Sequence, residues 1–135
     1  MNKEIAEFQE TLARALIADA TDDWRRIILD VEAGKVDGYD VENIVHLVIL
    51  QTDDGDWLCE DQIPPDDVIE TTSALREAYS KLTGDCWSIC ILTVENTGKY
   101  SFDFSYDQPK RLLGTADEAW YERTNNYLKL HRHEL

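Results

Sequence analysis

Basic residues are scarce in this sequence. Only 13 lysines and arginines stand against 28 aspartates and glutamates, which gives a formal charge of −15. Such a field repels the phosphates of nucleic acids and the surfaces of anionic membranes, so we expect direct binding to neither. The same field attracts a cationic protein and speeds its encounter with the chain. The charge therefore favours a basic protein as the partner.

Long apolar runs and cysteines are also few. No apolar run of the signal-peptide type follows Met1. The longest nearly apolar run, residues 44–50, is interrupted by His46 and is too short to cross a bilayer. The three cysteines, at positions 59, 86 and 90, form an odd number without the spacing of a disulfide framework. We therefore expect a cytoplasmic protein with reduced cysteines.

Groups that carry catalysis or bind metals are sparse as well. The histidines are His46, His131 and His133. The six glycines are scattered, and none belongs to a phosphate-binding loop pattern. The acidic run around Gly55 does not have EF-hand spacing, because the glycine comes third and Trp57 takes the place of an oxygen ligand. We expect no enzyme, no cofactor and no metal site; the alternative is a hydrolase that uses His46 or Asp103.

The patterning of apolar residues predicts the secondary structure. Residues 3–18, about 65–83 and 116–130 have helical spacing, and Trp120, Tyr127 and Leu130 are expected to face inward in the last helix. Residues 24–32, 43–51, 87–95 and 99–107 are typical of strands, and residues 33–42 and 52–67 are expected to be loops. The sequence thus predicts one α+β domain over residues 1–135. Its antiparallel four-stranded sheet is flanked by helices in the order α-ββ-α-ββ-α.

The acidic residues are concentrated in one region. Residues 52–70 contain eight acidic and no basic residues, whereas residues 86–135 are nearly balanced. Trp57 lies within this region, and an aromatic residue ringed by polar groups is typical of protein interfaces. The alternative is that Trp57 packs on the core and the carboxylates merely face water. With the polar face of the strand at 99–107 added, the predicted partner-binding residues are Asp53, Asp54, Asp56, Trp57, Glu60, Asp61, Asp66, Asp67 and Asp103.

Residues 87–107 contain a distinctive hairpin pattern. Trp87 opens a strand, a turn ends in Gly98-Lys99-Tyr100, and the run Phe102-Asp103-Phe104-Ser105-Tyr106-Asp107 alternates between aromatic and polar residues. This stretch resembles the YezG-like immunity protein family. The earlier strand with Trp24 and the last helix with Trp120 stand in the expected order. The acidic stretch at residues 52–67 and the long first hairpin loop are departures from the part that is similar.

The resemblance implies an antitoxin. Such a protein binds and neutralises a cognate polymorphic toxin, often a nuclease, in competition between bacteria. We expect a monomer that forms a 1:1 complex with its toxin. The toxin domain should be basic, because the active sites of nucleases bind polyphosphate. The alternative is an acidic adaptor or DNA mimic that inhibits a nucleic-acid enzyme.

Overall fold

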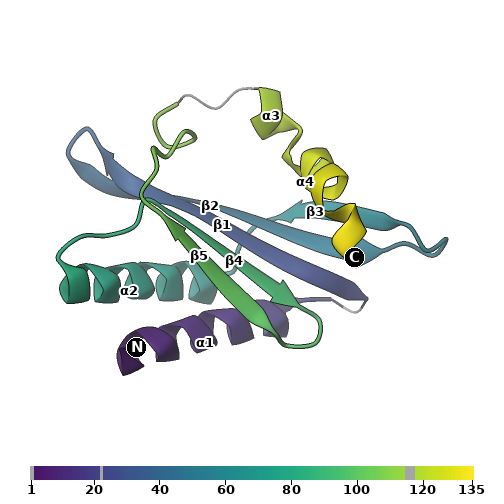
Figure 1. The fold of residues 1–135 in the computed structure, drawn as a ribbon, viewed down its shortest axis with the longest axis horizontal. Helices are drawn as coiled ribbons and strands as arrows, with labels where there is room; N and C mark the ends of the chain where they lie inside the picture. Colours follow the sequence, from purple (N-terminus) through teal and green to yellow (C-terminus); the bar gives the residue numbers. More distant parts are fainter. Residues whose placement is uncertain (1, 22, 115–117) are drawn as a thin grey trace.

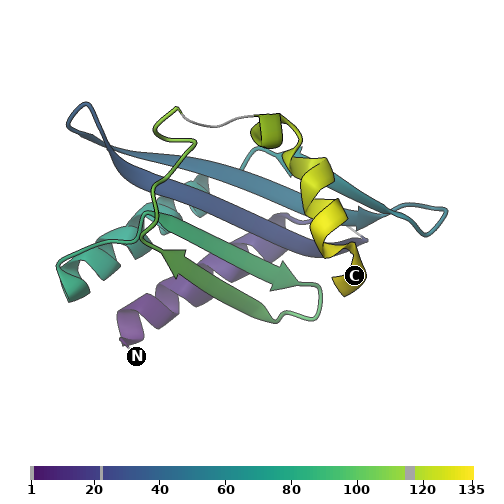
Figure 2. The same cartoon turned by 45° about the horizontal axis from the view of Figure 1, so that its top comes forward.

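The computed structural model describes residues 2–21, 23–114 and 118–135. A five-stranded antiparallel sheet with the order β3-β2-β1-β4-β5 forms the centre (Figure 1). Helices α1 (Lys3–Asp19) and α2 (Asp66–Thr83) cover one face. The short helices α3 (Glu118–Tyr121), α4 (Arg123–His131) and η1 (Arg132–Glu134) lie over the other face (Figure 2). Within the described residues, no helix is both long and apolar enough to cross a membrane.

The first hairpin is longer than the sequence pattern predicts. β1 (Trp24–Val36) and β2 (Tyr39–Gln51) pair in one register from Arg26 up to a two-residue turn, with a register shift between Trp24 and Arg26. Asp37 and Gly38 form this turn with φ values of 52° and 84°. Positive φ at both central residues suits the twist of a hairpin, and Asp-Gly is a favoured pair there. The loop expected at residues 33–42 is therefore wrong.

The acidic stretch expected to be a loop contains a strand. β3 (Trp57–Gln62) pairs antiparallel with β2, with Leu50 opposite Leu58 and Val48 opposite Glu60. It satisfies the free edge of β2, whose backbone groups would otherwise lack partners. The α+β class is thus confirmed, but the sheet has five strands rather than four, and the order is α-βββ-α-ββ-α.

The second hairpin agrees with the prediction. β4 (Ile89–Glu95) and β5 (Tyr100–Ser105) pair around a turn in which Gly98 has a φ of 89°. Because β5 alternates, Phe102 and Phe104 pack on the core while Asp103 is exposed on the opposite face. The Phe104 ring lies 4.8 Å from that of Tyr79 on α2.

Two apolar cores lie on the two faces of the sheet. The larger one packs alternate β1 residues, such as Ile27 and Leu29, against α1 and α2. The smaller one contains Ile28, Val45, Leu47, Ile49, Cys59 and Leu128. Trp57, Trp120 and Tyr127 pack against it. The second face is therefore only partly covered, and its cover is the C-terminal segment.

Two of the three predicted helices are confirmed, and the third differs. α1 and α2 are confirmed; Asn2 caps α1 by accepting a hydrogen bond of 3.1 Å from the Ile5 amide, and Gly84 ends α2 with a φ of 73°. The start of the last predicted helix, at residues 116 and 117, lies outside the described residues. From residue 118 onward the expected single helix is wrong, because it divides into α3 and α4 at Glu122. Trp120 and Tyr127 pack inward as expected, but Leu130 is 68% exposed.

Candidate protein-binding surface

One edge of the molecule carries most of the predicted binding residues. We call residues 52–70 the acidic edge: it comprises the β2–β3 turn, β3, the following loop and the first turn of α2. β3 is the outermost strand, so this segment lies at the margin of the sheet. Its acidic residues are Asp53, Asp54, Asp56, Glu60, Asp61, Asp66, Asp67 and Glu70, and all of them are exposed.

Hydrogen bonds shape the β2–β3 turn and keep its carboxylates ionised. The Thr52 amide donates to the Asp56 carbonyl over 2.8 Å, and Gly55 has a φ of 84°. Asp54 accepts hydrogen bonds from the Thr52 hydroxyl and the Asp56 amide, which lower the pKa of its carboxyl. The Trp57 amide and then Arg132 lower the pKa of Asp56 in the same way. Negative charge is therefore a fixed property of this turn near neutral pH.

The side chains of β3 alternate between the two faces of the sheet. Cys59 is buried in the smaller core, where burial raises the pKa of its thiol to about 12. Trp57 is half-buried and packs on the same core. The indole thus contacts the core, as the alternative interpretation of Trp57 expects, and part of it stays accessible; its role as a partner anchor stays a prediction.

Exposed apolar side chains also occur along the acidic edge. Ile63, in the loop after β3, is 91% exposed, and Leu58 on β3 is 45% exposed. Ile69 in the first turn of α2 is 37% exposed. An aliphatic side chain exposed to water does not stabilise the free protein, whereas its burial against a partner stabilises a complex. The acidic edge therefore combines negative charge with apolar side chains that a partner could bury.

Two carboxylates of the acidic edge already pair with arginines of the chain. Asp56 contacts Arg132 of η1, and Asp61 contacts Arg123 of α4. The Arg123 guanidinium also lies 3.8 Å from the centre of the Trp120 ring and donates to the Trp120 carbonyl over 2.8 Å. Both contacts join α4 and η1 to the edge of the sheet beside β3.

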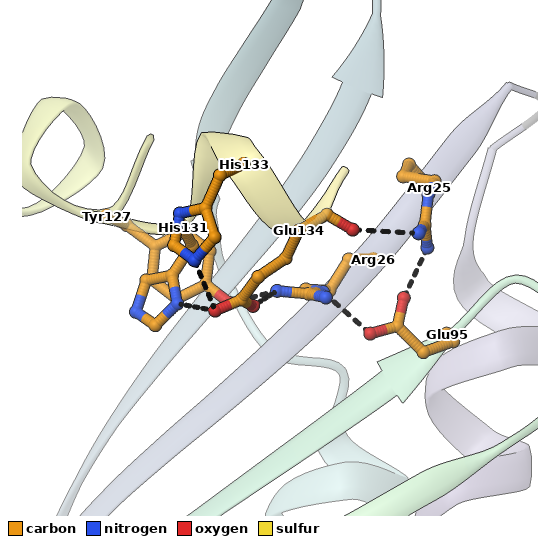
Figure 3. A network of polar contacts seen from close by, with 7 residues as sticks. All are labelled: Arg25, Arg26, Glu95, Tyr127, His131, His133 and Glu134. Carbon is orange, nitrogen blue, oxygen red and sulfur yellow. Dashed lines mark hydrogen bonds and ion pairs between the residues drawn. The ribbon is translucent and has the colours of Figure 1, made fainter. Parts of the chain in front are cut away.

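A further polar network holds the C-terminus on β1 (Figure 3). Arg26 is buried and lies 2.7 Å from Glu95 of β4 and 2.5 Å from Glu134 of η1. It also donates to the Tyr127 hydroxyl over 3.2 Å. Burial alone would lower the pKa of Arg26, but the hydrogen bonds to Glu134, Tyr127 and Glu95 raise it overall. Hydrogen bonds from Arg26 and His131 lower the pKa of Glu134 to about 2.

The remaining predicted residue lies elsewhere. Asp103 is on β5, at the opposite edge of the sheet from β3, with β2, β1 and β4 between them. The predicted residues from Asp53 to Asp67 thus all belong to the acidic edge, and Asp103 does not. His46 is buried on β2, and burial lowers the pKa of its imidazole. It is likewise separated from the exposed Asp103, so the two residues of the hydrolase alternative do not share a site.

A hollow of about 490 Å³ lies on the partly covered face, between the sheet and α4. Ile91 and Asp103 line it from the sheet, and Trp120 and Leu130 line it from the C-terminal helices. Arg111 closes one end, where it lies 3.2 Å from Asp30 and 3.1 Å from Glu32. Across the part of the chain that the structure describes, no group of three or more His, Cys, Asp and Glu side chains could hold a metal ion.

No known protein family matches the sequence, and no curated protein is similar enough to count as a relative. The resemblance to the YezG-like immunity proteins therefore stays a prediction.

Ile63, Arg123 and Arg132 are the residues of this surface that the sequence pattern did not single out. Ile63 had a local signal, because it is an isolated apolar residue between an acidic run and two prolines. The arginines had none, since they lie 62 and 76 residues from their partners along the chain.

Proposed function

We propose that this protein binds and neutralises a cationic partner protein, as an immunity protein does with its toxin. The acidic edge is the contact surface, and the partner is a cytoplasmic toxin domain with a basic active-site groove, of the nuclease class. The protein acts as a monomer in a 1:1 complex and performs no catalysis.

One observation carries the proposal. Residues 52–70 contain eight acidic residues and no basic one, and the same segment carries Ile63, whose side chain is 91% exposed. Charge at the rim steers a cationic partner to the surface, and a central apolar side chain supplies much of the binding energy once water is excluded. Fast capture suits an inhibitor that must stop a few toxin molecules before they act.

Coexpression tests the proposal. The product of the neighbouring reading frame is produced in a host cell with the wild-type chain or with the Asp53→Lys/Asp66→Lys variant. Neither carboxylate makes a hydrogen bond or ion pair that holds the described fold together, so this variant should fold. We expect the wild type to restore growth and to copurify in a 1:1 complex, and the variant to protect less. Capture of several nucleic-acid enzymes in place of one toxin would instead support the acidic adaptor.

A further inference from the structure

We infer that the face of the sheet beneath α4 and η1 is a docking surface for an arginine-bearing amphipathic segment of the partner. In the structure, α4 and η1 occupy this surface as a displaceable substitute for that segment. The inference deepens the proposed function, because it names the second contact surface and the chemistry of the partner that fits it.

The chain itself shows which chemistry fits. Arg132 of η1 contacts Asp56 and Arg123 of α4 contacts Asp61, while Leu128 of α4 enters the smaller core. Two arginines with an apolar residue between them thus meet two carboxylates and an apolar face. A partner segment with the same pattern would satisfy the same groups, and the chain's excess of negative charge favours its approach.

Apart from the partly buried Tyr127, which bonds to Arg26, α4 contributes few side chains to its contact with the sheet. The helix has nine residues, and Leu128 is its only buried one. A helix this short is marginal on its own in water. The side chains of Arg132 and Asp56 are 50% and 60% exposed, and exposed ion pairs stabilise a fold very little. Release of α4 therefore costs mainly the burial of a few apolar side chains.

Release of α4 and η1 would not leave a buried charge without a partner. Among the described residues, Arg26 is the buried cation at this contact, and it pairs with Glu95 of β4 as well as with Glu134 of η1. Figure 3 shows Glu95 and Glu134 approaching Arg26 from different elements. When Glu134 leaves, Arg26 keeps Glu95 and gains access to water, so the large penalty of an unpaired buried charge is avoided.

The surface also extends beyond α4. α4 forms one wall of the hollow of about 490 Å³, with Leu130, and the sheet forms the other, with Ile91 of β4, which would remain in place after release of α4. A longer partner segment would bury this remaining area as well. The partner segment can displace α4 only if it binds the sheet more tightly when α4 is released than when α4 is in place. The extra area that it buries in the hollow supplies this difference in binding free energy.

Cysteine labelling on the full chain tests whether α4 opens. Cys59 lies in the core beneath α4, and Cys90 lies in the core on the opposite face. Opening of α4 should expose Cys59 alone, whereas global unfolding exposes both. Iodoacetamide labelling, located by mass spectrometry, is compared in the wild type, in Arg123→Glu/Arg132→Glu and in Lys129→Glu. Lys129 is the matched control, because it is exposed on the same helix.

We expect labelling of Cys59 to be about tenfold faster in Arg123→Glu/Arg132→Glu, because the variant loses both ion pairs and the Arg123–Trp120 contact and places glutamates beside Asp61 and Asp56. Labelling of Cys90 should not change, and Lys129→Glu should behave as the wild type. Equal labelling of Cys59 in all three proteins would overturn the inference, as would parallel acceleration of Cys59 and Cys90.

A synthetic peptide of residues 118–135 tests docking without any toxin. Added in excess to the Arg123→Glu/Arg132→Glu protein, it should bind the vacated face and slow the labelling of Cys59. In the wild type, the tethered helix has a high effective concentration, so the peptide should have little effect. A peptide that carries the same two Arg→Glu changes is the control. Equal protection by both peptides, or by neither, would contradict the docking surface, even if the toxin-binding proposal holds.

Discussion

Ile63 and Trp57 differ in what each can contribute to binding. Ile63 is 91% exposed, whereas Trp57 is half-buried against the smaller core. The sequence pattern emphasised Trp57, because large aromatic residues dominate interfaces. The structure shifts the emphasis to Ile63, since its whole side chain is available for burial by a partner.

The substitution Ile63→Ala should therefore separate binding from folding. We expect the free energy of unfolding to stay within about 0.5 kcal/mol of the wild type, as for most surface changes. Dissociation from the captured toxin should be faster, corresponding to a loss of about 2 kcal/mol of binding free energy. Urea denaturation and surface plasmon resonance measure the two effects. Trp57→Ala is the comparison, and it should cost about 2 kcal/mol of folding stability because it removes part of the smaller core.

The pKa of Glu134 indicates how acid affects the C-terminal contact, by which η1 is held on β1 through Arg26. Arg26 and His131 lower its folded pKa from 4.5 to about 2. A carboxylate with a lowered pKa stabilises the folded state above its unfolded pKa, and this contribution is lost as the pH falls toward the folded value. We therefore expect the C-terminal contact to weaken between about pH 5 and pH 2.

Labelling of Cys59 is not suitable at low pH, so NMR signals of residues 123–134 provide the measurement. These signals should shift as added acid protonates the Glu134 carboxylate. In Glu134→Gln this component of the titration should be absent; its persistence would show that another group controls the contact.

At the scale of elements, turn chemistry explains the largest misprediction. The Asp37-Gly38 pair is a strong hairpin signal, but Gly34 nearby suggested a loop across residues 33–42. Gly34 instead lies within β1, and a Cβ on it would lie 3.4 Å from Leu112 Cδ2, an ordinary contact. β3 escaped detection because its acidic residues hide the alternation of a strand, although it forms a hairpin with β2 across the turn at residues 52–56.

The two glycines of this hairpin make a matched pair. Gly38→Ala places a Cβ on a residue with a φ of 84°, so we expect a loss of about 1–2 kcal/mol of folding stability. Gly34→Ala should be neutral or slightly stabilising, because a strand interior favours a side chain over glycine. Thermal or urea unfolding of both variants measures the difference; a larger loss for Gly34→Ala would contradict the turn geometry.

At the scale of the whole molecule, the sequence predicted what depends on composition and local periodicity. The α+β class, α1, α2 and the second hairpin follow from local patterns, as does the acidic character of residues 52–70. The arrangement of the surface does not. Pairing of Asp56 with Arg132, and of Asp61 with Arg123, depends on which elements meet across the sheet. The same is true of the separation of Asp103 from the acidic edge.

The central claim is that the acidic edge, rather than net charge alone, captures a cationic protein. The most direct test is the association rate of the captured toxin at low ionic strength, with Asp53→Lys/Asp66→Lys compared with Glu7→Lys/Asp107→Lys, whose two carboxylates are exposed and lie outside both proposed contact surfaces. Both variants change the net charge equally, but only the first alters the acidic edge. We expect the first variant to slow association by about tenfold and to weaken its salt dependence, and the second to have a much smaller effect. Equal slowing by both variants, or none by the first, would contradict the account.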